Sequence, residues 1–333
     1  SDVLIELVVK DGDTNKTVIV KVSDVYTITN GVFGAIKTFA DPSDPSKTYN
    51  ASSIVKLVIP AGVTSIPTGA IKNMSSLVEI VLLDGANATF AKDSIDTCEN
   101  LEKLTLGECT VVFSSFTVKS KTENTADGAN DGVTIPTCPN FATIDATKAN
   151  VTFQDLSFRF NGAIKHVLLG EGNTYSFGKY CFQRSALEEV IIPDNATVTS
   201  LAIKAFAETK TLTYVYIGAN CLTERVNGKV ALGSDNNSSV FGGNGSLSKM
   251  VLMDVEYIGK WVLSVKTSGD YVSRNDLYIY CHSDSLEFNS ASSNSAFNDR
   301  NAYNVYIYAK NIVNNPLNCH YVIYKGIPHK YVE

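Results

Sequence analysis

The sequence predicts a β-rich α/β fold in which short repeats stack into one elongated solenoid. A strand-like segment recurs along the chain, and a second, different signature follows it within each repeat. The best-spaced copies start at 54, 77 and 101 and again at 164, 187 and 212, which gives steps of 23 to 25 residues. Such steps leave no room for the crossover helices of a compact α/β domain, so the repeat is the better explanation.

The first half of each repeat is a short strand. "LEEVIIP" (187–193) and "LTYVYIG" (212–218) show its pattern, with apolar residues at the first, fourth and sixth positions. This period-2 spacing and the many β-branched and aromatic residues favour a strand. The other copies are IVKLVIP (54–60), LVEIVLL (77–83), LEKLTLG (101–107), FATIDAT (141–147), IKHVLLG (164–170), LSKMVLM (247–253), DLYIYCH (276–282) and NVYIYAK (304–310).

The second half combines an apolar residue with a small and another apolar residue four and five positions later. Leu201 with Ala205 and Phe206 is one example. Spacing of four to five residues favours a brief helical turn. The other copies begin at Ile28, Ile66, Phe90, Phe153, Phe177 and Ile258.

A single repeat is too small to be stable alone. Its apolar side chains contribute about 10–20 kcal/mol when buried, whereas ordering its backbone and side chains costs about 25–45 kcal/mol. Each repeat must therefore bury its faces against its neighbours, which is how solenoids are built.

The pattern L-x-x-V-x-I-P followed by V-T-S-I and A-F, at 187–212 and 54–77, resembles BspA-type leucine-rich repeats. The resemblance covers about residues 54–310. It implies a right-handed leucine-rich-repeat solenoid with a parallel sheet on its concave face and short helical turns on its convex face. The family is associated with adhesion to host or extracellular-matrix proteins and to other cells. The resemblance therefore implies a secreted or cell-surface recognition protein, located outside the cell.

Three regions are expected along the chain. Residues 1–50 begin with a β-hairpin, "VLIELVV" and "TVIVKV", which we expect to cap the array. Residues 51–310 form the solenoid, with polar, glycine-rich insertions at about 108–140 and 219–246, and residues 311–333 form a C-terminal cap. We expect the insertions to be surface loops, where specific contacts are often located.

Residues between the buried positions of each strand point outward and form two rows across the sheet. In the predicted alignment Val251, Tyr278 and Tyr306 share an apolar and aromatic row, beside a row of mixed charge. Contiguous exposed apolar surface is uncommon without a partner, and tyrosine is enriched in protein interfaces. The sequence therefore predicts a docking face on the concave sheet. Its residues are His166, Leu168, Glu189, Ile191, Tyr214, Tyr216, Lys249, Val251, Tyr278, Tyr280, Tyr306 and Tyr308.

The two rows do not by themselves require a docking face. Plain β-propensity on a parallel sheet gives the same pattern. A partner could be a protein or a glycan at a cell or matrix surface, and the chain could instead self-associate into a coat or filament.

Composition excludes several functions. The formal net charge of −6 argues against nucleic-acid binding, and no apolar run is long enough to span a membrane. The four histidines are scattered, and no phosphate-binding loop or nucleophile elbow is present. We therefore expect a protein that is not an enzyme, with no cofactor and no metal. The seven cysteines show no CxxC motif and are expected to be buried thiols.

Glycosylation acceptors of the form Asn-x-Ser/Thr exceed the number that composition alone would give, about five. This mild excess is compatible with a secreted eukaryotic protein. The nine candidates are Asn15, Asn50, Asn73, Asn87, Asn150, Asn195, Asn236, Asn237 and Asn244.

Overall fold

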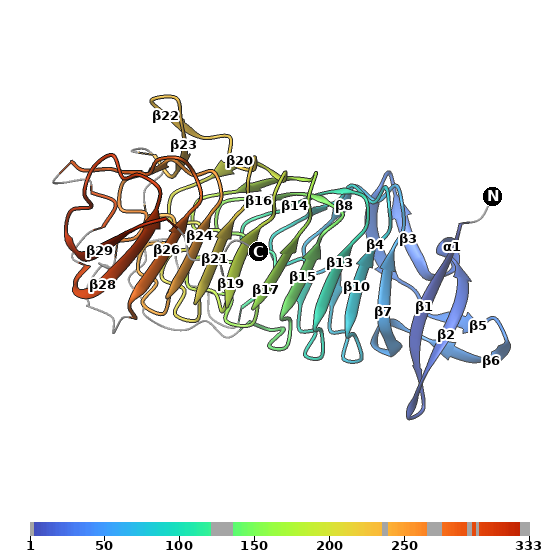
Figure 1. Ribbon diagram of the computed structural model, residues 1–333. Coiled ribbons are helices and arrows are strands. Elements are labelled where there is room, and N and C mark those ends of the chain that lie inside the picture. Colours follow the sequence, from blue (N-terminus) through green and yellow to red (C-terminus); the bar gives the residue numbers. More distant parts are fainter. Residues whose placement is uncertain are drawn as a thin grey trace. The chain divides into compact units, whose positions relative to one another are not determined.

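The computed structural model describes residues 3–120, 136–234, 239–264, 275–291, 295–297 and 300–326, apart from the side chains of 300–303. The chain divides into two units, and Figure 1 draws their strands and turns in the colours of the sequence. The first comprises Ser1–Thr152 and Phe160–Leu168, and the second comprises Phe153–Arg159 and Leu169–Glu333. Both consist of stacked β-strands joined by turns, which confirms the strand-rich repeat fold that the sequence predicts.

The first halves of the repeats form a parallel sheet in each unit, here called the front sheet. In the first unit this sheet contains β7 (Ile54–Ile59), β10 (Glu79–Leu82), β13 (Lys103–Leu106), β15 (Thr143–Ala146) and β17 (His166–Leu169). Strands pair in register, so Glu79 lies between Lys56 and Lys103. Ile80 and Leu82 are buried, as the alternation of the sequence requires.

The front sheet of the second unit contains six parallel strands. They are β19 (Glu189–Ile192), β21 (Tyr214–Ile217), β24 (Lys249–Leu252), β26 (Leu277–Cys281), β28 (Arg300–Ala309) and β29 (Cys319–Lys325). The last strand extends this sheet beyond residue 310, into the region expected to be a C-terminal cap.

An antiparallel hairpin borders the front sheet of the first unit. It consists of β1 (Leu4–Asp11) and β2 (Thr14–Lys21), and β1 also pairs with β7. The position of the hairpin is the one that a cap would occupy; the division of the chain into cap, solenoid and C-terminal region stays a prediction. The elements between β2 and β7 are α1 (Val22–Val25), β3 (Tyr26–Thr29), β4 (Val32–Ile36), β5 (Phe39–Asp41), β6 (Asp44–Tyr49) and the 3-10 helix η1 (Ala51–Ser53).

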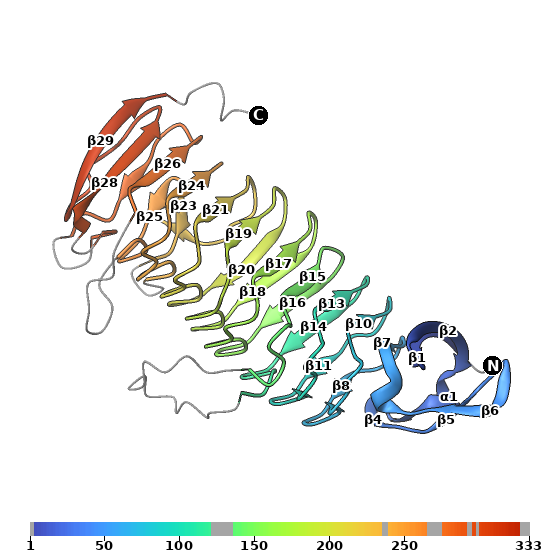
Figure 2. The same ribbon diagram turned by 90° about the horizontal axis from the view of Figure 1, so that it is seen from below.

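The second halves of the repeats form shorter strands on the opposite side of the coils, here called the back sheet (Figure 2). In the first unit these are β4, β8 (Ser65–Ile66), β11 (Thr89–Phe90), β14 (Thr110–Phe113) and β16 (Asn150–Phe153), with β9 (Ile71–Lys72) and β12 (Ile95–Asp96) as a separate pair. In the second unit they are β18 (Thr174–Phe177), β20 (Thr197–Leu201), β23 (Lys229–Leu232), β25 (Tyr257–Ile258) and β27 (Glu287–Phe288).

The prediction of a helical turn in the second half of each repeat is wrong in detail. Among the described residues α1 is the one α-helix, and the second halves are short strands followed by tight turns. In the turn after β20, Ala205 N–H donates to Ala202 O at 3.2 Å, and Lys204 then has a φ of 53°. A residue in this left-handed region ends a helical turn at once. The copy predicted at Ile28 is also wrong, since Ile28 pairs with Phe33 in the β3–β4 hairpin.

Stacked phenylalanines fill the core of the second unit behind these turns. Phe158, Phe182, Phe206 and Phe241 are buried and lie one per coil. Successive ring centroids are 5.5, 5.7 and 5.5 Å apart, with angles of 11°, 4° and 10° between the ring planes. Each ring therefore packs against its equivalent in the next coil, which is how a repeat buries a face that it cannot bury alone.

Aspartates fix the stagger between neighbouring coils. Asp84 Oδ1 accepts the backbone N–H of Glu108 at 2.7 Å, and Asp194 Oδ1 accepts that of Ala219 at the same distance. Gly218 allows this close approach, because a Cβ there would lie 2.5 Å from the backbone nitrogen of Asp194. The glycine that ends the predicted strand thus serves contact between coils.

The first insertion leaves the coil at a narrow base. Ser120 and Pro136 form an antiparallel bridge, and Thr137 N–H donates to Lys119 O at 2.9 Å. The residues that make this coil longer than its neighbours are therefore those between 120 and 136. Residues 121–135 lie outside the described part of the chain.

The second insertion is mainly a hairpin. Its strands are β22 (Arg225–Val226) and β23, and Asn227 and Gly228 join them with φ angles of 50° and 81°. These angles and this residue pair are typical of a type I′ turn. The expectation of a surface loop is wrong for residues 239–245, which are buried and include Phe241 of the phenylalanine stack.

All seven cysteines are buried and carry free thiols, as expected from the sequence.

Candidate functional site

The predicted docking residues of the last strands lie in a register different from the one expected. Lys249 lies beside Tyr278, and Val251 beside Tyr280, two residues away from the predicted alignment. The next strand continues these rows, with Tyr306 beside Tyr278. The prediction that Val251, Tyr278 and Tyr306 share one row is therefore wrong.

Two rows of tyrosines lie on the last strands, one across β26, β28 and β29 and the other across β26 and β28. In one row the rings of Tyr280 and Tyr308 are 4.9 Å apart, and those of Tyr308 and Tyr324 are 4.6 Å apart. In the other row Tyr278 and Tyr306 stack at 4.7 Å. All three pairs are within 14° of parallel. We call these five residues the tyrosine face.

Stacking covers ring faces within the tyrosine face. Both ring faces of Tyr308 are covered, by Tyr280 on one side and Tyr324 on the other. Such a surface offers hydroxyl groups and ring edges in a fixed arrangement. Since the stacked rings have little freedom left to lose, binding to them costs little side-chain entropy.

Exposure separates the predicted residues into two groups. Tyr278 and Tyr324 are exposed, at 36% and 41%, so they can meet a partner. Val251 and Tyr280 are only 8% and 4% exposed, so the prediction that a partner contacts them directly is wrong. Tyr280 is a buried member of the tyrosine face, and it holds Tyr308 in place by stacking on it from the neighbouring strand.

A lysine and a carboxylate hold the neighbouring tyrosines of β21. The ammonium of Lys249 lies 5.3 Å from the ring centroid of Tyr214 and 5.9 Å from that of Tyr280, within cation–π range. The hydroxyl of Tyr216 donates to Asp194 Oδ1 at 3.0 Å. Burial, and then this bond to a carboxylate, raise the pKa of Tyr216 to about 12.

The predicted site residues are divided between the units. His166 and Leu168 belong to the first unit, whereas Glu189 and Ile191 belong to the second. Leu168 and Ile191 are both exposed, at 38%. The docking face as predicted across these four residues therefore stays a prediction.

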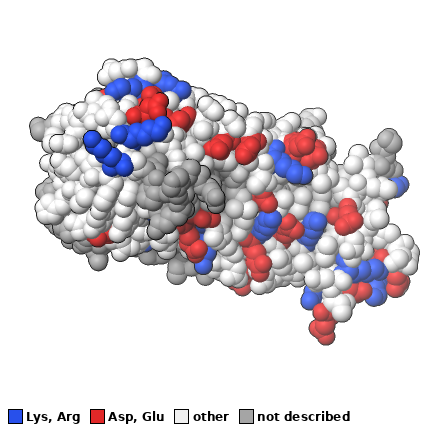
Figure 3. Space-filling view, viewed as in Figure 1, with Lys and Arg blue, Asp and Glu red and all other residues white. Residues whose placement is uncertain are grey.

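The first unit carries charge at the equivalent outward positions. Lys103 pairs with Asp145 at 3.0 Å, and Thr105 Oγ1 donates to Glu79 Oε1 at 2.7 Å. In Figure 3 blue and red residues alternate over these strands, whereas the area of β26, β28 and β29 is largely white. The tyrosine face is thus an uncharged patch, which favours contact with a partner.

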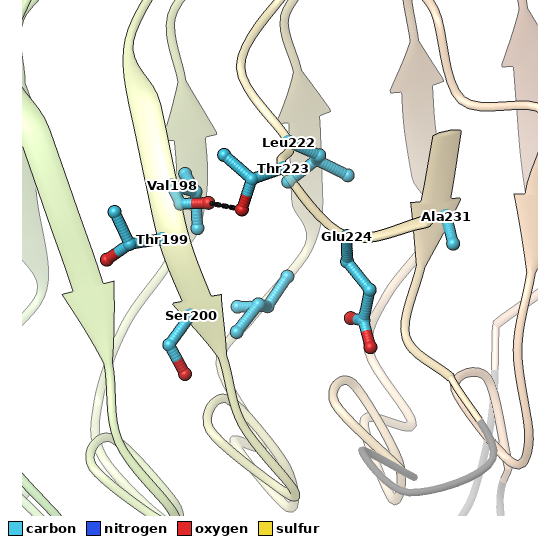
Figure 4. Close-up of a pocket in the computed structure, with 8 residues that line it drawn as sticks. Val198, Thr199, Ser200, Leu222, Thr223, Glu224 and Ala231 are labelled. Carbon is cyan, nitrogen blue, oxygen red and sulfur yellow. Dashed lines mark hydrogen bonds between the residues drawn. The ribbon is translucent and has the colours of Figure 1, made fainter. Parts of the chain in front are cut away.

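A small pocket lies beside the hairpin of the second insertion (Figure 4). It has a volume of about 210 Å³ and forms where β20 meets Leu222 through a single bridge before the chain departs into β22. Thr223 Oγ1 donates to Val198 O at 2.8 Å across it. Its other polar side chains are those of Thr199, Ser200 and Glu224. No sequence pattern indicates this pocket, because its walls come from two different repeats.

The structure sorts the nine candidate glycosylation acceptors into three groups. Asn244 is 2% exposed, accepts from Thr209 N–H at 2.7 Å and donates to Phe206 O at 2.9 Å, so the prediction that it is an acceptor is wrong for the folded chain. Asn236 and Asn237 lie outside the described residues. The exposed candidates are Asn15, Asn50, Asn73, Asn87, Asn150 and Asn195, whose glycosylation stays a prediction.

Turn geometry explains part of the asparagine excess. Asn73 and Asn195 have φ angles of 56° and 58°, a region that asparagine adopts more readily than most residues. Asn87 Oδ1 accepts the N–H of Thr110 in the next coil at 2.7 Å. These asparagines therefore have a structural role whether or not they carry a glycan.

Metal-binding clusters and membrane-spanning helices are both absent from the described residues. No group of three or more His, Cys, Asp or Glu side chains there is arranged to hold a metal ion. In the same part of the chain no helix is both long enough and apolar enough to cross a membrane.

Comparison with known proteins identifies the repeats. A family model for the BspA type leucine rich repeat region matches six copies, over residues 45–126 and 136–226, which together make up more than half of the chain. A comparison with curated proteins found no match.

Two solved structures are similar to the chain, each at 12% identity and a TM-score of 0.32 over 97% of this chain. One is a leucine-rich repeat protein from Bacteroides ovatus, of which 89% is covered. The other is a leucine rich cell surface protein from Faecalibacterium prausnitzii, of which 96% is covered. The six matched repeats, together with the stacked parallel strands, show that the chain belongs to the BspA-type leucine-rich-repeat family.

Proposed function

We propose that the chain is a secreted or cell-surface recognition protein that binds a protein partner through the tyrosine face of its second unit. Repeats of this family provide an interaction module, and the tyrosine face is the uncharged aromatic patch on the front sheet of the second unit. Tyrosine is among the residues that dominate the free energy of protein interfaces. The proposal includes no catalytic step.

The stacking of the rings supports a protein partner over a glycan. A sugar ring packs against an exposed aromatic ring face, whereas both faces of Tyr308 are occupied by neighbouring tyrosines. Ring edges and hydroxyl groups suit the mixed apolar and polar surface of a protein. The stacked arrangement of Tyr308 is the single observation that carries this choice.

Parallel binding assays would test the proposal. Immobilised chain would be offered an array of purified extracellular-matrix proteins and a glycan array. We expect protein binding that weakens about 10- to 100-fold when Tyr306 and Tyr308 are replaced by serine. The matched control replaces Lys103 and Thr105, outward residues of the first unit, and should bind as the unchanged chain does.

Three results would contradict the proposal. They are glycan binding that is lost in the tyrosine variant, protein binding that the tyrosine variant retains, and self-association into particles that grow with concentration. The first would assign a glycan-binding module and the third a coat or filament protein. Light scattering on the same samples measures the third.

A further inference from the structure

Two cysteines that are 40 residues apart in the sequence lie side by side in the first unit. The backbone N–H of Cys98 donates to the sulfur of Cys138 at 3.4 Å. One residue earlier, Thr97 N–H donates to Thr137 Oγ1 at 3.0 Å. The two segments therefore run next to each other in adjacent coils, with Cys98 and Cys138 in equivalent positions.

A third contact holds the segments together beyond the cysteines. Asn140 Nδ2 donates to Glu99 O at 2.8 Å. Contacts before, at and after the cysteines thus fix the separation of the two segments. Hydrogen-bonded neighbouring strands are about 4.8 Å apart, and a similar spacing between these hydrogen-bonded segments would lie inside the range of about 4.4–6.8 Å between the Cα atoms of disulfide-bonded cysteines.

We propose that Cys98 and Cys138 form a disulfide bond when the chain folds in an oxidising environment. The bond would link two neighbouring coils and close a covalent ring that includes residues 99–137. Its base is the point at which the first insertion leaves the coil. The proposal is independent of the partner that the tyrosine face binds.

The two sulfurs have different surroundings in the folded chain. Cys138 accepts a hydrogen bond from the Cys98 thiol and another from the Cys98 N–H, and these bonds lower the pKa of the Cys138 thiol. Donating that bond, together with burial, raises the pKa of the Cys98 thiol. In the folded chain the two sulfurs are therefore already in hydrogen-bond contact, with Cys98 as the donor and Cys138 as the acceptor.

Oxidation by a disulfide reagent balances as two exchange steps. The thiolate of one of the two cysteines attacks oxidised glutathione, forms a mixed disulfide and releases one glutathione thiolate. The other cysteine loses its proton and attacks the protein sulfur of the mixed disulfide, which releases the second glutathione thiolate. The two cysteine thiols lose two electrons and two protons, and one oxidised glutathione becomes two reduced glutathiones.

The burial of both cysteines determines at which stage of folding they can exchange with glutathione. Both cysteine side chains have no exposed surface in the folded chain, so glutathione cannot reach them there. The bond must form while the first unit is still opening and closing during folding. Once formed, it is protected from reductants by the same burial.

The test uses the full chain, refolded from denaturant with a mixture of oxidised and reduced glutathione or with reduced glutathione alone. Trypsin cuts after lysine and arginine, which places Cys98 in the peptide 93–103 and Cys138 in the peptide 122–148. Each peptide contains one cysteine. We expect these two peptides joined in the oxidised sample, with a mass about two hydrogens below their sum.

Two variants test whether the pairing is specific. Cys98→Ser should abolish the joined peptide and leave Cys138 open to alkylation after unfolding. Cys181→Ser is the matched control, because Cys181 is equally buried but bonds to the Ala205 carbonyl, and it should leave the joined peptide unchanged. Circular dichroism in the far ultraviolet checks that the strands of each variant have formed.

The proposal is overturned if Cys98 and Cys138 are both alkylated in the folded, glutathione-oxidised chain after unfolding. It is equally overturned if either cysteine is found joined to one of the other five in place of its neighbour. A joined pair that dithiothreitol reduces only after denaturant is added supports both the bond and its burial.

Discussion

The front sheets of the two units share one strand geometry and carry different outer rows. In the first unit Glu79, Lys103 and Asp145 give the surface alternating charge. In the second unit tyrosines of three successive strands stack on one another. The backbone pairing is parallel and in register in both, so the fold sets the spacing of the outer residues and leaves their chemistry free. Specific function must therefore be sought in the outer rows.

The strongest test of the second unit replaces a ring of its phenylalanine stack. Phe206→Ala removes a ring that contacts Phe182 and Phe241 and should destabilise this unit by about 3–5 kcal/mol, because the cavity cannot close between fixed coils. Denaturation followed by the fluorescence of Trp261, the single tryptophan, measures the loss. Phe206→Leu is the control and should cost less than half as much. A loss below about 1 kcal/mol for Phe206→Ala would contradict the stacked core.

A smaller effect is expected at the hairpin of the second insertion. Gly228 has a φ of 81°, and a Cβ at this position would have no neighbour within 4 Å. Gly228→Ala therefore costs conformational energy alone, about 1–2 kcal/mol. Hydrogen exchange of the amides in β22 and β23 should then rise while that of β21 stays the same. Unchanged exchange in the hairpin would contradict the type I′ turn.

Acid should affect the first unit through Asp41. Its carboxylate accepts from Lys16, Ser43 and Tyr49, and the bond from Lys16 is the main reason that the pKa of Asp41 lies well below its ordinary value. This contribution to stability is present above the ordinary carboxyl pKa of about 4. It is lost as the pH falls below that value through the pKa of the folded state.

Circular dichroism during denaturation at pH values between about 5 and about 2 tests this. The unchanged chain should lose stability as the pH falls over that range. Asp41→Asn should reduce this dependence of the free energy of unfolding on pH. Asp44→Asn changes a neighbour that is more exposed and should reduce the dependence less. Equal slopes for the unchanged chain and Asp41→Asn would contradict the role of Asp41.

The smallest expected difference compares one lysine from each outer row. Lys103→Ala removes a partly exposed ion pair worth about 0–1 kcal/mol, which salt screens. Lys249→Ala removes a cation–π contact worth about 0.5–1 kcal/mol, which depends less on salt. Denaturation at about 0.05 and about 0.5 M NaCl compares them. A stronger salt dependence for Lys249→Ala than for Lys103→Ala would reverse the distinction between the rows.

Local alternation is enough to predict the front sheets, but not their register. "LEEVIIP" and "LTYVYIG" pair as their spacing requires. The predicted alignment of "DLYIYCH" is two residues away from its true position, because Tyr278 and Tyr280 alternate with Ile279 in either alignment. A shift of two residues keeps every side chain on its own face, so the hydrophobic pattern cannot detect it.

The turns and insertions are harder to predict for a different reason. A spacing of four to five residues is shared by a helical turn and by a strand followed by a tight turn, and the left-handed residue Lys204 is not a glycine that would reveal the difference. Asn227-Gly228 is a usable hairpin signal that the polar composition around it obscures. The burial of Val251 and Tyr280 depends on packing between repeats, which no single repeat encodes.

The aspartate bonds between coils have a mechanical consequence for the protein. In the second unit each coil is held to the next by sheet hydrogen bonds and by contacts such as Asp194 to Ala219. Tension would therefore act first on the outermost coil, which has such a neighbour on one side only. Each coil must lose these bonds together before the next one carries the force. Pulling should therefore release chain in steps of one repeat, and a tether built this way would lengthen gradually under load without losing its remaining coils.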